Sequence, residues 1–439
     1  MGVRMVMAWV ALAAAGGPLA APPCPGDRPP NVVFIISDDH GWADYGFMGH
    51  PAVRTPHLDR LASQSVLFTR GYVAAPLCCP SLASILSGRH PHQHRITCND
   101  PNIPVGRPRA QAWMSPEVQS QREAVFAYYR KAPMLPRVLA PLGYASLQTG
   151  KWWGGPFETG GFTAGMTHGD ARRGGRHGDA GLEIGRKTMQ PLFDFLDATG
   201  GKPFFLWYAP MLPHEPHNPP DRILAHYRDR APSPSLAKYW AMIEWFDETC
   251  GQILDYLDRK GLSENTLVCY LADNGWTQKP DGPGFEPRSK RNHYDEGVRT
   301  PLMVRWPARA RPRRDDATPV SAVDLAATVR AACGLGPDPE GGGGVNLLDE
   351  AAVGGRDAVF SARYTHDALD IHDPRANLLS RTVVSGWWKL IVPHAAALPQ
   401  EGLELYDLKA DPREERNRAA DRPDLVEKLR ARLDAWWKP

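Results

Sequence analysis

The stretch Asn31-Val-Val-Phe-Ile-Ile-Ser37, followed directly by Asp38-Asp39, decides the fold. Its five central residues are all apolar, and four of them are β-branched. A short run of this kind is typical of a strand that is buried on both faces, as in a parallel sheet covered by helices. The carboxyl ends of parallel strands gather at one edge of an open sheet, where ligands bind. The run therefore predicts a central strand that carries two carboxylates to the ligand-binding edge.

The rest of the chain alternates short apolar runs with amphipathic stretches, which favours an α/β fold. Further strands are predicted at Phe204–Tyr208 and at Thr266–Leu271. A helix is predicted over Pro56–Phe68, with Thr55 as its N-cap. A second helix is predicted over Tyr239–Lys260, because its apolar residues recur at helical spacing and Gly261 follows.

Three further stretches of the sequence indicate how the rest of the chain is organised. Residues 151–181 are rich in glycine and predict a long active-site loop, and Pro337–Gly344 resembles a linker. Beyond about residue 350, strands are predicted near 376–392 and a last helix over about 423–437. We therefore expect a catalytic domain over residues 28–350 and a smaller α+β subdomain over residues 351–439.

Composition excludes several classes of protein. With 439 residues, 42% of them hydrophobic, the chain can bury a sizeable core, and a formal charge of +2 gives no electrostatic footprint for nucleic acid. Arg4, the apolar run Met5–Ala15 and the mostly small residues Gly16–Ala21 predict a signal peptide over residues 1–21, although a buried first helix would give a similar pattern. No later run approaches the length of a membrane span. We expect an exported protein, periplasmic or extracellular.

Two pairs of oxygen-bearing side chains follow separate predicted strands. Asp38-Asp39 follows the first strand, and Asp273-Asn274 follows the strand at 266–271. Each pair alone could be a turn or a helix cap. Together at one sheet edge they favour a hard cation such as calcium or magnesium.

A cysteine also lies next to a predicted helix start. The stretch Leu77-Cys78-Cys79-Pro80-Ser81-Leu82 precedes a helical segment at Ala83–Ser87. The N–H groups and dipole of a helix N-terminus favour negative charge, so this position could activate a thiol or hold an anion. The alternative is a buried structural thiol. The seven cysteines include no Cys-x-x-Cys pair and are too few and scattered for a disulfide scaffold.

Six motifs follow one another in the order seen in type I sulfatases, and the chain resembles that family from about residue 30 to its C-terminus. They are Asp38-Asp39, the Cys-x-Pro-Ser stretch at Cys78, Gly150-Lys151-Trp152, Pro213-His214, Asp273-Asn274-Gly275 and Lys290-x-x-x-Tyr294-x-x-Gly297. The resemblance implies a sulfuric ester hydrolase. It also implies an alkaline-phosphatase-like α/β fold, a mixed sheet sandwiched by helices with a smaller C-terminal α+β subdomain.

The resemblance also implies a role for each matching residue. Cys78 would be oxidised to formylglycine by a formylglycine-generating enzyme, and its hydrated aldehyde would attack the sulfur of a sulfate ester. Lys151 and Lys290 would hold the sulfate oxygens, and His214 would protonate the departing alcohol. One calcium ion would be bound by the modified Cys78 and by four further residues: Asp38, Asp39, Asp273 and Asn274.

Two positions depart from the family pattern. Leu82 stands where the modification signature usually has arginine, and Trp153 stands where the family commonly has the histidine that acts as base. Several histidines could replace that base, and we expect it to be His94 or His168. The others are His90, His92 and His177.

The substrate class stays open between a sulfated carbohydrate and a small aryl sulfate. Tryptophans near the motifs could stack on sugar rings, although core packing explains most tryptophans equally well. They are Trp152, Trp153, Trp207 and Trp276. Two other functions remain: a phosphoester or phosphonate hydrolase of the same superfamily, often with two transition metals, and a catalytically inactive homologue that binds sulfate or glycan.

Overall fold

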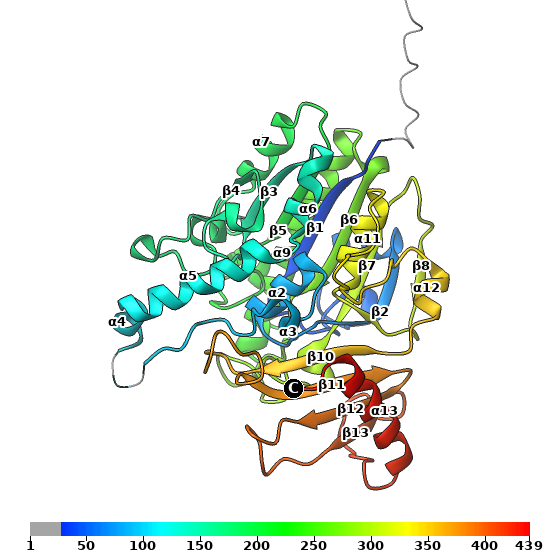
Figure 1. The fold of residues 1–439 in the computed structure, drawn as a ribbon. Coiled ribbons are helices and arrows are strands. Elements are labelled where there is room, and N and C mark those ends of the chain that lie inside the picture. Colours follow the sequence, from blue (N-terminus) through cyan, green and yellow to red (C-terminus); the bar gives the residue numbers. More distant parts are fainter. Residues whose placement is uncertain (1–27, 105, 107) are drawn as a thin grey trace, which may run out of the picture.

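The computed structural model describes residues 28–439 except 105 and 107, so the predicted signal peptide lies outside the described residues (Figure 1). In this part of the chain, a large sheet has the strand order β4-β3-β5-β1-β6-β7-β2-β8, and β9 pairs with β2. Its strands are β1 (Asn31–Ser37), β2 (Val66–Tyr72), β3 (Ala145–Gly150), β4 (Ala164–Gly165), β5 (Phe204–Ala209), β6 (Thr266–Ala272), β7 (Arg299–Arg305), β8 (Arg313–Asp315) and β9 (Val320–Ser321).

Strand β1 lies at the centre of this sheet and pairs in parallel with β5 and β6. Val33 and Ile35 belong to one apolar cluster, and Val32 and Phe34 belong to another. Successive side chains of a strand point to opposite faces, so β1 is buried on both. Strand β7 runs antiparallel to β6 and β2, which makes the sheet mixed.

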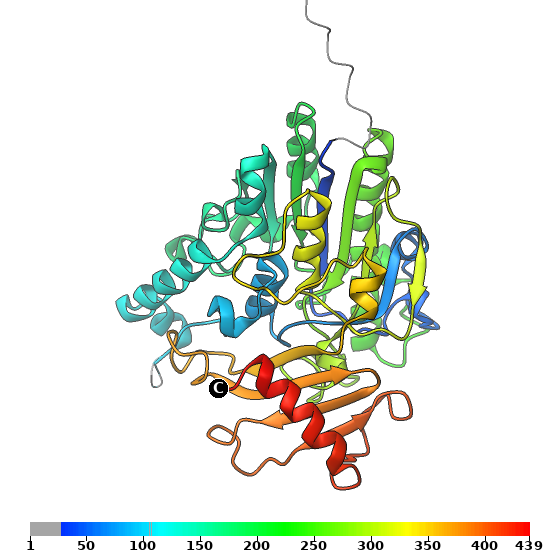
Figure 2. The same ribbon diagram turned by 45° about the vertical axis from the view of Figure 1, so that its right-hand side comes forward.

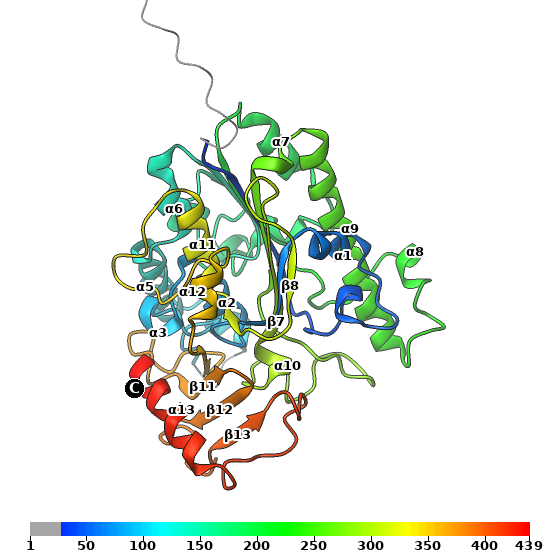
Figure 3. The ribbon, with the colours of Figure 1, turned by 90° about the vertical axis from the view of Figure 1, so that its right-hand side faces the viewer.

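Helices cover both faces of the large sheet (Figure 3). The cluster that contains Val33 includes residues of α1 (Pro56–Ser63), α7 (Gln190–Ala198) and α9 (Pro234–Arg259). The opposite cluster includes residues of α2 (Cys78–Ser87), α5 (Pro116–Lys131), α6 (Leu135–Leu139) and α11 (Asp324–Ala332). The remaining α-helices are short: α3 (Pro91–His94), α4 (Arg109–Trp113), α8 (Asp221–Leu224), α10 (Asp295–Val298) and α12 (Glu350–Gly354). The predicted sandwich is confirmed.

A second, antiparallel sheet follows near the C-terminus. It contains β10 (Val359–Tyr364), β11 (Leu378–Ser385), β12 (Trp388–Pro393) and β13 (Glu404–Asp407). Helix α13 (Pro423–Trp436) lies across one face (Figure 2), where Leu429 and Leu433 pack against this sheet. The Ala362 N–H donates to the carbonyl of Ala74 at 3.0 Å, so β10 contacts the segment between β2 and α2.

Three predicted boundaries were wrong. The helix predicted to reach Phe68 ends at Ser63, because the β-branched and aromatic residues from Val66 onwards form β2. Helix α2 begins at Cys78 rather than at Ala83. Helix α9 begins at Pro234, earlier than predicted, because the Ser233 hydroxyl accepts the N–H of Leu236 as an N-cap.

The predicted linker at 337–344 contains no helix or strand, but Arg89 donates to Asp338 at 2.7 Å and ties it to the end of α2. Within residues 28–439, leaving out 105 and 107, no helix has both the length and the apolar character needed to cross a membrane.

Candidate active site

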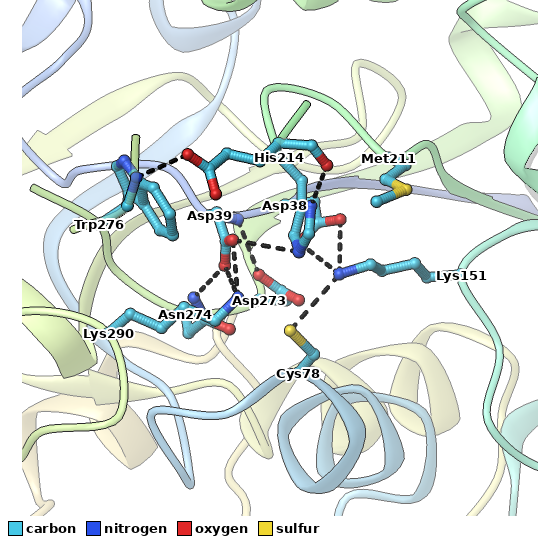
Figure 4. Close-up of polar contacts among 12 residues, drawn as sticks. Asp38, Asp39, Cys78, Lys151, Met211, His214, Asp273, Asn274, Trp276 and Lys290 are labelled. Carbon is cyan, nitrogen blue, oxygen red and sulfur yellow. Dashed lines mark hydrogen bonds and ion pairs between the residues drawn. The ribbon is translucent and has the colours of Figure 1, made fainter. Parts of the chain in front are cut away.

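The two acidic or amide pairs meet at the carboxyl ends of β1 and β6 (Figure 4). Ser37 pairs with Ala272 across the parallel strands, so the residues that follow them lie side by side. The backbone N–H of Asp39 donates to Asp273 Oδ1 at 3.2 Å, and Asn274 Nδ2 donates to Asp39 Oδ1 at 2.7 Å. The prediction that parallel strands gather these side chains agrees with this geometry.

Cys78 opens helix α2 and points toward this group of side chains (Figure 4). Cys78 is 1% exposed, and Lys151 Nζ lies 3.4 Å from the Cys78 Sγ. Burial raises the pKa of the Cys78 thiol to about 12, against the opposing charges of Lys151 and Lys290. The thiolate is the nucleophilic form of cysteine, so the unmodified side chain is not activated at neutral pH.

Two buried lysines approach the carboxylates from different elements. Lys151 Nζ lies 2.7 Å from Asp38 Oδ2, and Lys290 Nζ lies 2.5 Å from Asp39 Oδ1. Lys151 follows Gly150, whose φ is +77° and whose position would bring a Cβ to 1.9 Å from the Ala209 carbonyl oxygen. Only glycine allows this close turn at the end of β3, which brings Lys151 into the site.

His214 lies on the loop after β5. Its Nε2 lies 3.3 Å from Asp39 Oδ2, and its Nδ1 bonds to the Glu215 carbonyl oxygen at 2.6 Å. Burial and the charge of Lys151 hold the pKa of His214 well below its usual value, against the effect of Asp39. Arg186 donates to the His214 carbonyl oxygen at 2.7 Å and fixes this loop.

The donor set fits a hard cation. Oxygen atoms of Asp38 and Asp39 and the sulfur of Cys78 lie within 4.8 Å of one another. Among the described residues, the buried Asp273 Oδ2 and Asn274 Oδ1 have no hydrogen-bond partner. Unpaired buried oxygens are costly unless a ligand satisfies them, and oxygen ligands of this kind suit calcium or magnesium.

A cavity of about 530 Å³ opens above Cys78. It is lined by three more of the predicted catalytic residues: Lys151, His214 and Lys290. The segment 151–181, predicted as a long active-site loop, also contributes Trp153, and Trp153 is the one member of the four tryptophans quoted above that lines this cavity in the described structure.

The two histidines predicted to replace the base, His94 and His168, do not line this cavity. His94 Nε2 bonds to the Ser84 hydroxyl at 3.0 Å, and its Nδ1 accepts the N–H of Ile96 at 3.0 Å, so both ring nitrogens are engaged. His168 Nδ1 accepts the N–H of Asp170 at 3.0 Å. His177 lines the cavity instead, with its ring centroid 4.9 Å from that of Trp153.

Most of the outer wall of the cavity was not predicted from the sequence. It comes from residues that lie far apart in the chain: Asn99, Arg109, Arg176, Arg291, His366 and Asp367. Arg109 and Arg176 each form an ion pair with the buried Asp100. Arg176 belongs to the predicted active-site loop and Arg291 follows Lys290, but no spacing along the chain connects Asn99, Arg109, His366 and Asp367 with the recognised motifs.

Comparison with known proteins agrees with this geometry. The family model described as "Sulfatase" matches residues 30–335, and the model described as "N-sulphoglucosamine sulphohydrolase, C-terminal" matches residues 286–438. The chain is 27% identical to the N-acetylgalactosamine-6-sulfatase of Canis lupus familiaris over 76% of this chain and 66% of that enzyme. It is 24% identical to the N-acetylgalactosamine-6-O-sulfatase of Bacteroides thetaiotaomicron over 92% of this chain and 93% of that one.

Solved structures share the fold. Ps i-CgsB in complex with k-i-k-neocarrahexaose has a TM-score of 0.72 at 22% identity, with 93% of each chain covered. The phosphonate monoester hydrolase of Agrobacterium radiobacter has a TM-score of 0.67 at 19% identity, with 92% of this chain and 95% of that one covered. At these identities the similarity establishes the fold alone.

Proposed function

The chain belongs to the sulfatase family, and from that premise we propose that it is a calcium-dependent sulfuric ester hydrolase that acts on a sulfated carbohydrate or an aryl sulfate. The observation that carries the proposal is the convergence of Cys78, Lys151, His214 and Lys290 on one cavity beside an oxygen-rich group with unpaired acceptors. The two lysines beside the nucleophile can bind the negative charge of a sulfate ester, and His214 can serve as the proton donor that the leaving alcohol needs.

The nucleophile in this proposal is Cys78 after oxidation by a formylglycine-generating enzyme. Formylglycine supplies a hydrated aldehyde oxygen as nucleophile and a second hydroxyl that lets sulfate leave. The high pKa of the unmodified thiol supports the need for this modification. Leu82, which stands where the family signature usually has arginine, belongs to the apolar core on its side of the sheet.

The residues around the nucleophile divide the remaining work. Lys151 and Lys290 bind the sulfate oxygens as compact charges, and Lys151 also orients the side chain at position 78. His214 is held by Arg186 and by the Glu215 carbonyl oxygen, to which its Nδ1–H donates. The negative charge of a bound sulfate ester favours protonation of its Nε2, which then gives that proton to the departing alcohol. Asp38, Asp39, Asp273, Asn274 and the modified Cys78 would hold calcium, which supplies charge neutralisation for the sulfate.

We assign the missing base to His177. It lines the cavity, and its Nδ1 is buried with no partner among the described residues. A neutral imidazole can accept a proton. The N–H of Trp152 donates to the His177 carbonyl oxygen at 3.2 Å and holds this segment at the cavity.

Export is part of the same proposal, because sulfated polysaccharides lie outside cells and residues 1–21 have the pattern of a signal peptide. The mature enzyme would act in the periplasm or the extracellular space.

The test is product analysis with matched esters. Protein produced with a formylglycine-generating enzyme is assayed with 4-nitrophenyl sulfate, sulfated N-acetylgalactosamine, a phosphate diester and a phosphonate monoester, with calcium or with chelator. Sulfate release that needs calcium supports the proposal. Faster phosphonate or phosphate release with two zinc or manganese ions would favour the hydrolase alternative, and binding of sulfated sugar without turnover would favour the inactive homologue.

A further inference from the structure

Arg291 follows Lys290 directly and lines the cavity above Cys78. Its backbone has a φ of +64°, in the left-handed region. A residue with a side chain is disfavoured there by about 1 kcal/mol or more, and such strain persists only where the surroundings impose it.

Hydrogen bonds on both sides of Arg291 impose this conformation. Its N–H donates to the carbonyl of Pro76 at 2.9 Å, and its own carbonyl accepts a hydrogen bond from Arg363 Nε at 2.9 Å. Pro76 lies two residues before Cys78, and Arg363 belongs to β10. The backbone of Arg291 is therefore fixed relative to the candidate nucleophile.

The other cations of the cavity each have a carboxylate partner. Arg109 and Arg176 pair with Asp100, and Lys151 and Lys290 pair with Asp38 and Asp39 in turn.

Among the described residues, no carboxylate or carbonyl lies within hydrogen-bond distance of the Arg291 guanidinium, and its one aromatic neighbour is Phe285, whose ring centroid lies 6.0 Å away. His366 is another residue of the cavity wall, and its pKa is lowered mainly by burial and next by the charge of Arg291. Within the described part of the chain, Arg291 is therefore an exposed cation of this cavity that has no anionic partner.

We propose that Arg291 binds a second anionic group, a carboxylate or a second sulfate, on the molecule whose sulfate ester lies at Cys78. The planar guanidinium matches either group with two parallel hydrogen bonds. The inference rests on the proposed function and narrows its substrate class to acidic saccharides that carry more than one charge.

The test compares Arg291→Gln with Arg311→Gln. Glutamine keeps a side chain at the left-handed position, so the backbone strain is matched. Arg311 is exposed between β7 and β8 and does not line the cavity, so its substitution makes the same change in net charge elsewhere.

Three substrates separate the sources of the second charge: a sulfated disaccharide with a uronic carboxylate, its carboxyl-reduced form, and a disulfated disaccharide without a carboxylate. Arg291→Gln should lower kcat/KM by about 10- to 100-fold on whichever doubly charged substrate the wild type prefers, and by less than about twofold on the singly charged one. Arg311→Gln should change neither. Equal losses on singly and doubly charged substrates, or no loss on any, would overturn the proposal.

Binding separates this inference from the proposed function. Calorimetry with unmodified protein and the same saccharides needs no turnover. If no sulfate ester is hydrolysed by the wild type, the proposed function fails. The proposed role of Arg291 is still supported if Arg291→Gln weakens binding of only the doubly charged saccharides by about tenfold or more. It is contradicted if the variant does not weaken their binding in this way.

Discussion

The molecule buries two groups of charged side chains, and they differ in what they leave unpaired. One is the group around Cys78 described above. The other, here named the inter-sheet cluster, consists of Lys389 from β12, Asp295 from α10 and Glu414. Lys389 Nζ lies 3.0 Å from Asp295 Oδ1 and 2.8 Å from Glu414 Oε1, and Glu414 Oε2 accepts the Asp295 N–H at 2.5 Å.

The inter-sheet cluster does not line the cavity above Cys78, and it joins helix α10 to strand β12 of the small sheet. The group at Cys78 opens to a cavity, and Asp273 Oδ2 and Asn274 Oδ1 have no hydrogen-bond partner in the part of the chain that the structure describes. Buried lysine–carboxylate pairs therefore do not by themselves mark an active site. Access and unpaired oxygens do, because they leave room and need for ligands.

The largest effect is expected at Cys78, the nucleophile of the group that opens to the cavity. Cys78→Ser removes the precursor of the aldehyde and should lower kcat by at least about 10⁴-fold, because the covalent step cannot turn over. Sulfate release measures it. Cys79→Ala is the control, since the Cys79 Sγ contacts the Tyr129 hydroxyl at 3.2 Å and does not line the cavity. Equal activity of both variants would contradict the assignment of Cys78.

The next effect distinguishes the two groups by stability. Lys389→Met leaves the carboxylates of Asp295 and Glu414 without their lysine and should lower the free energy of unfolding by roughly 3–5 kcal/mol. Urea denaturation measures the change. Lys151→Met should instead lower kcat by about 10²-fold or more, and it should lower the free energy of unfolding by less than Lys389→Met does when calcium is present. Exchanged outcomes for the two lysines would show that the roles are misassigned.

Calcium should stabilise only the group at Cys78. At a calcium concentration about 100 times Kd, a ligand that binds only folded protein adds about 2.7 kcal/mol to the free energy of unfolding. Addition of chelator should remove this gain in the wild type and in Lys389→Met, and Asp273→Ala should show no gain. A gain that survives in Asp273→Ala would contradict the proposed ligand set.

The smallest effect concerns pH and the inter-sheet cluster. Burial and the charge of Asp295 raise the pKa of Glu414 to about 7, against the effect of Lys389. Because the folded pKa lies above the unfolded one, this stabilising contribution is complete below about pH 4.5 and is lost as pH rises through about 7. The free energy of unfolding should therefore fall by about 1–3 kcal/mol more in wild type than in Glu414→Gln between pH 5 and pH 8. Identical pH profiles would contradict the shifted pKa.

Much of the fold and part of the site follow from local sequence. The run from Asn31 to Ser37 predicts its strand because every central position is apolar and the sheet buries both faces. The helix predicted through Phe68 overran because Leu67 and Phe68 continue the helical spacing, and only pairing with β7 shows that they belong to a strand. Strand β10 was not predicted, although it pairs antiparallel with β11, the next strand along the chain.

The replacement base shows the same limit. A histidine beside the Cys78 helix was a reasonable choice, but His94 folds back onto Ser84 of that helix. His177 reaches the cavity through the path of the glycine-rich segment, which no spacing encodes. Arg291 lies next to a recognised motif, yet its unpaired guanidinium is visible only when the surrounding carboxylates are in place.

The most direct test of the central claim is peptide mass spectrometry across Cys78, on protein produced in a host with a formylglycine-generating system and on protein from the native host. We expect an aldehyde at residue 78 that a hydrazide traps, which would show that Leu82 is tolerated in the modification sequence. An unmodified thiol at Cys78 in both preparations would contradict the proposed mechanism.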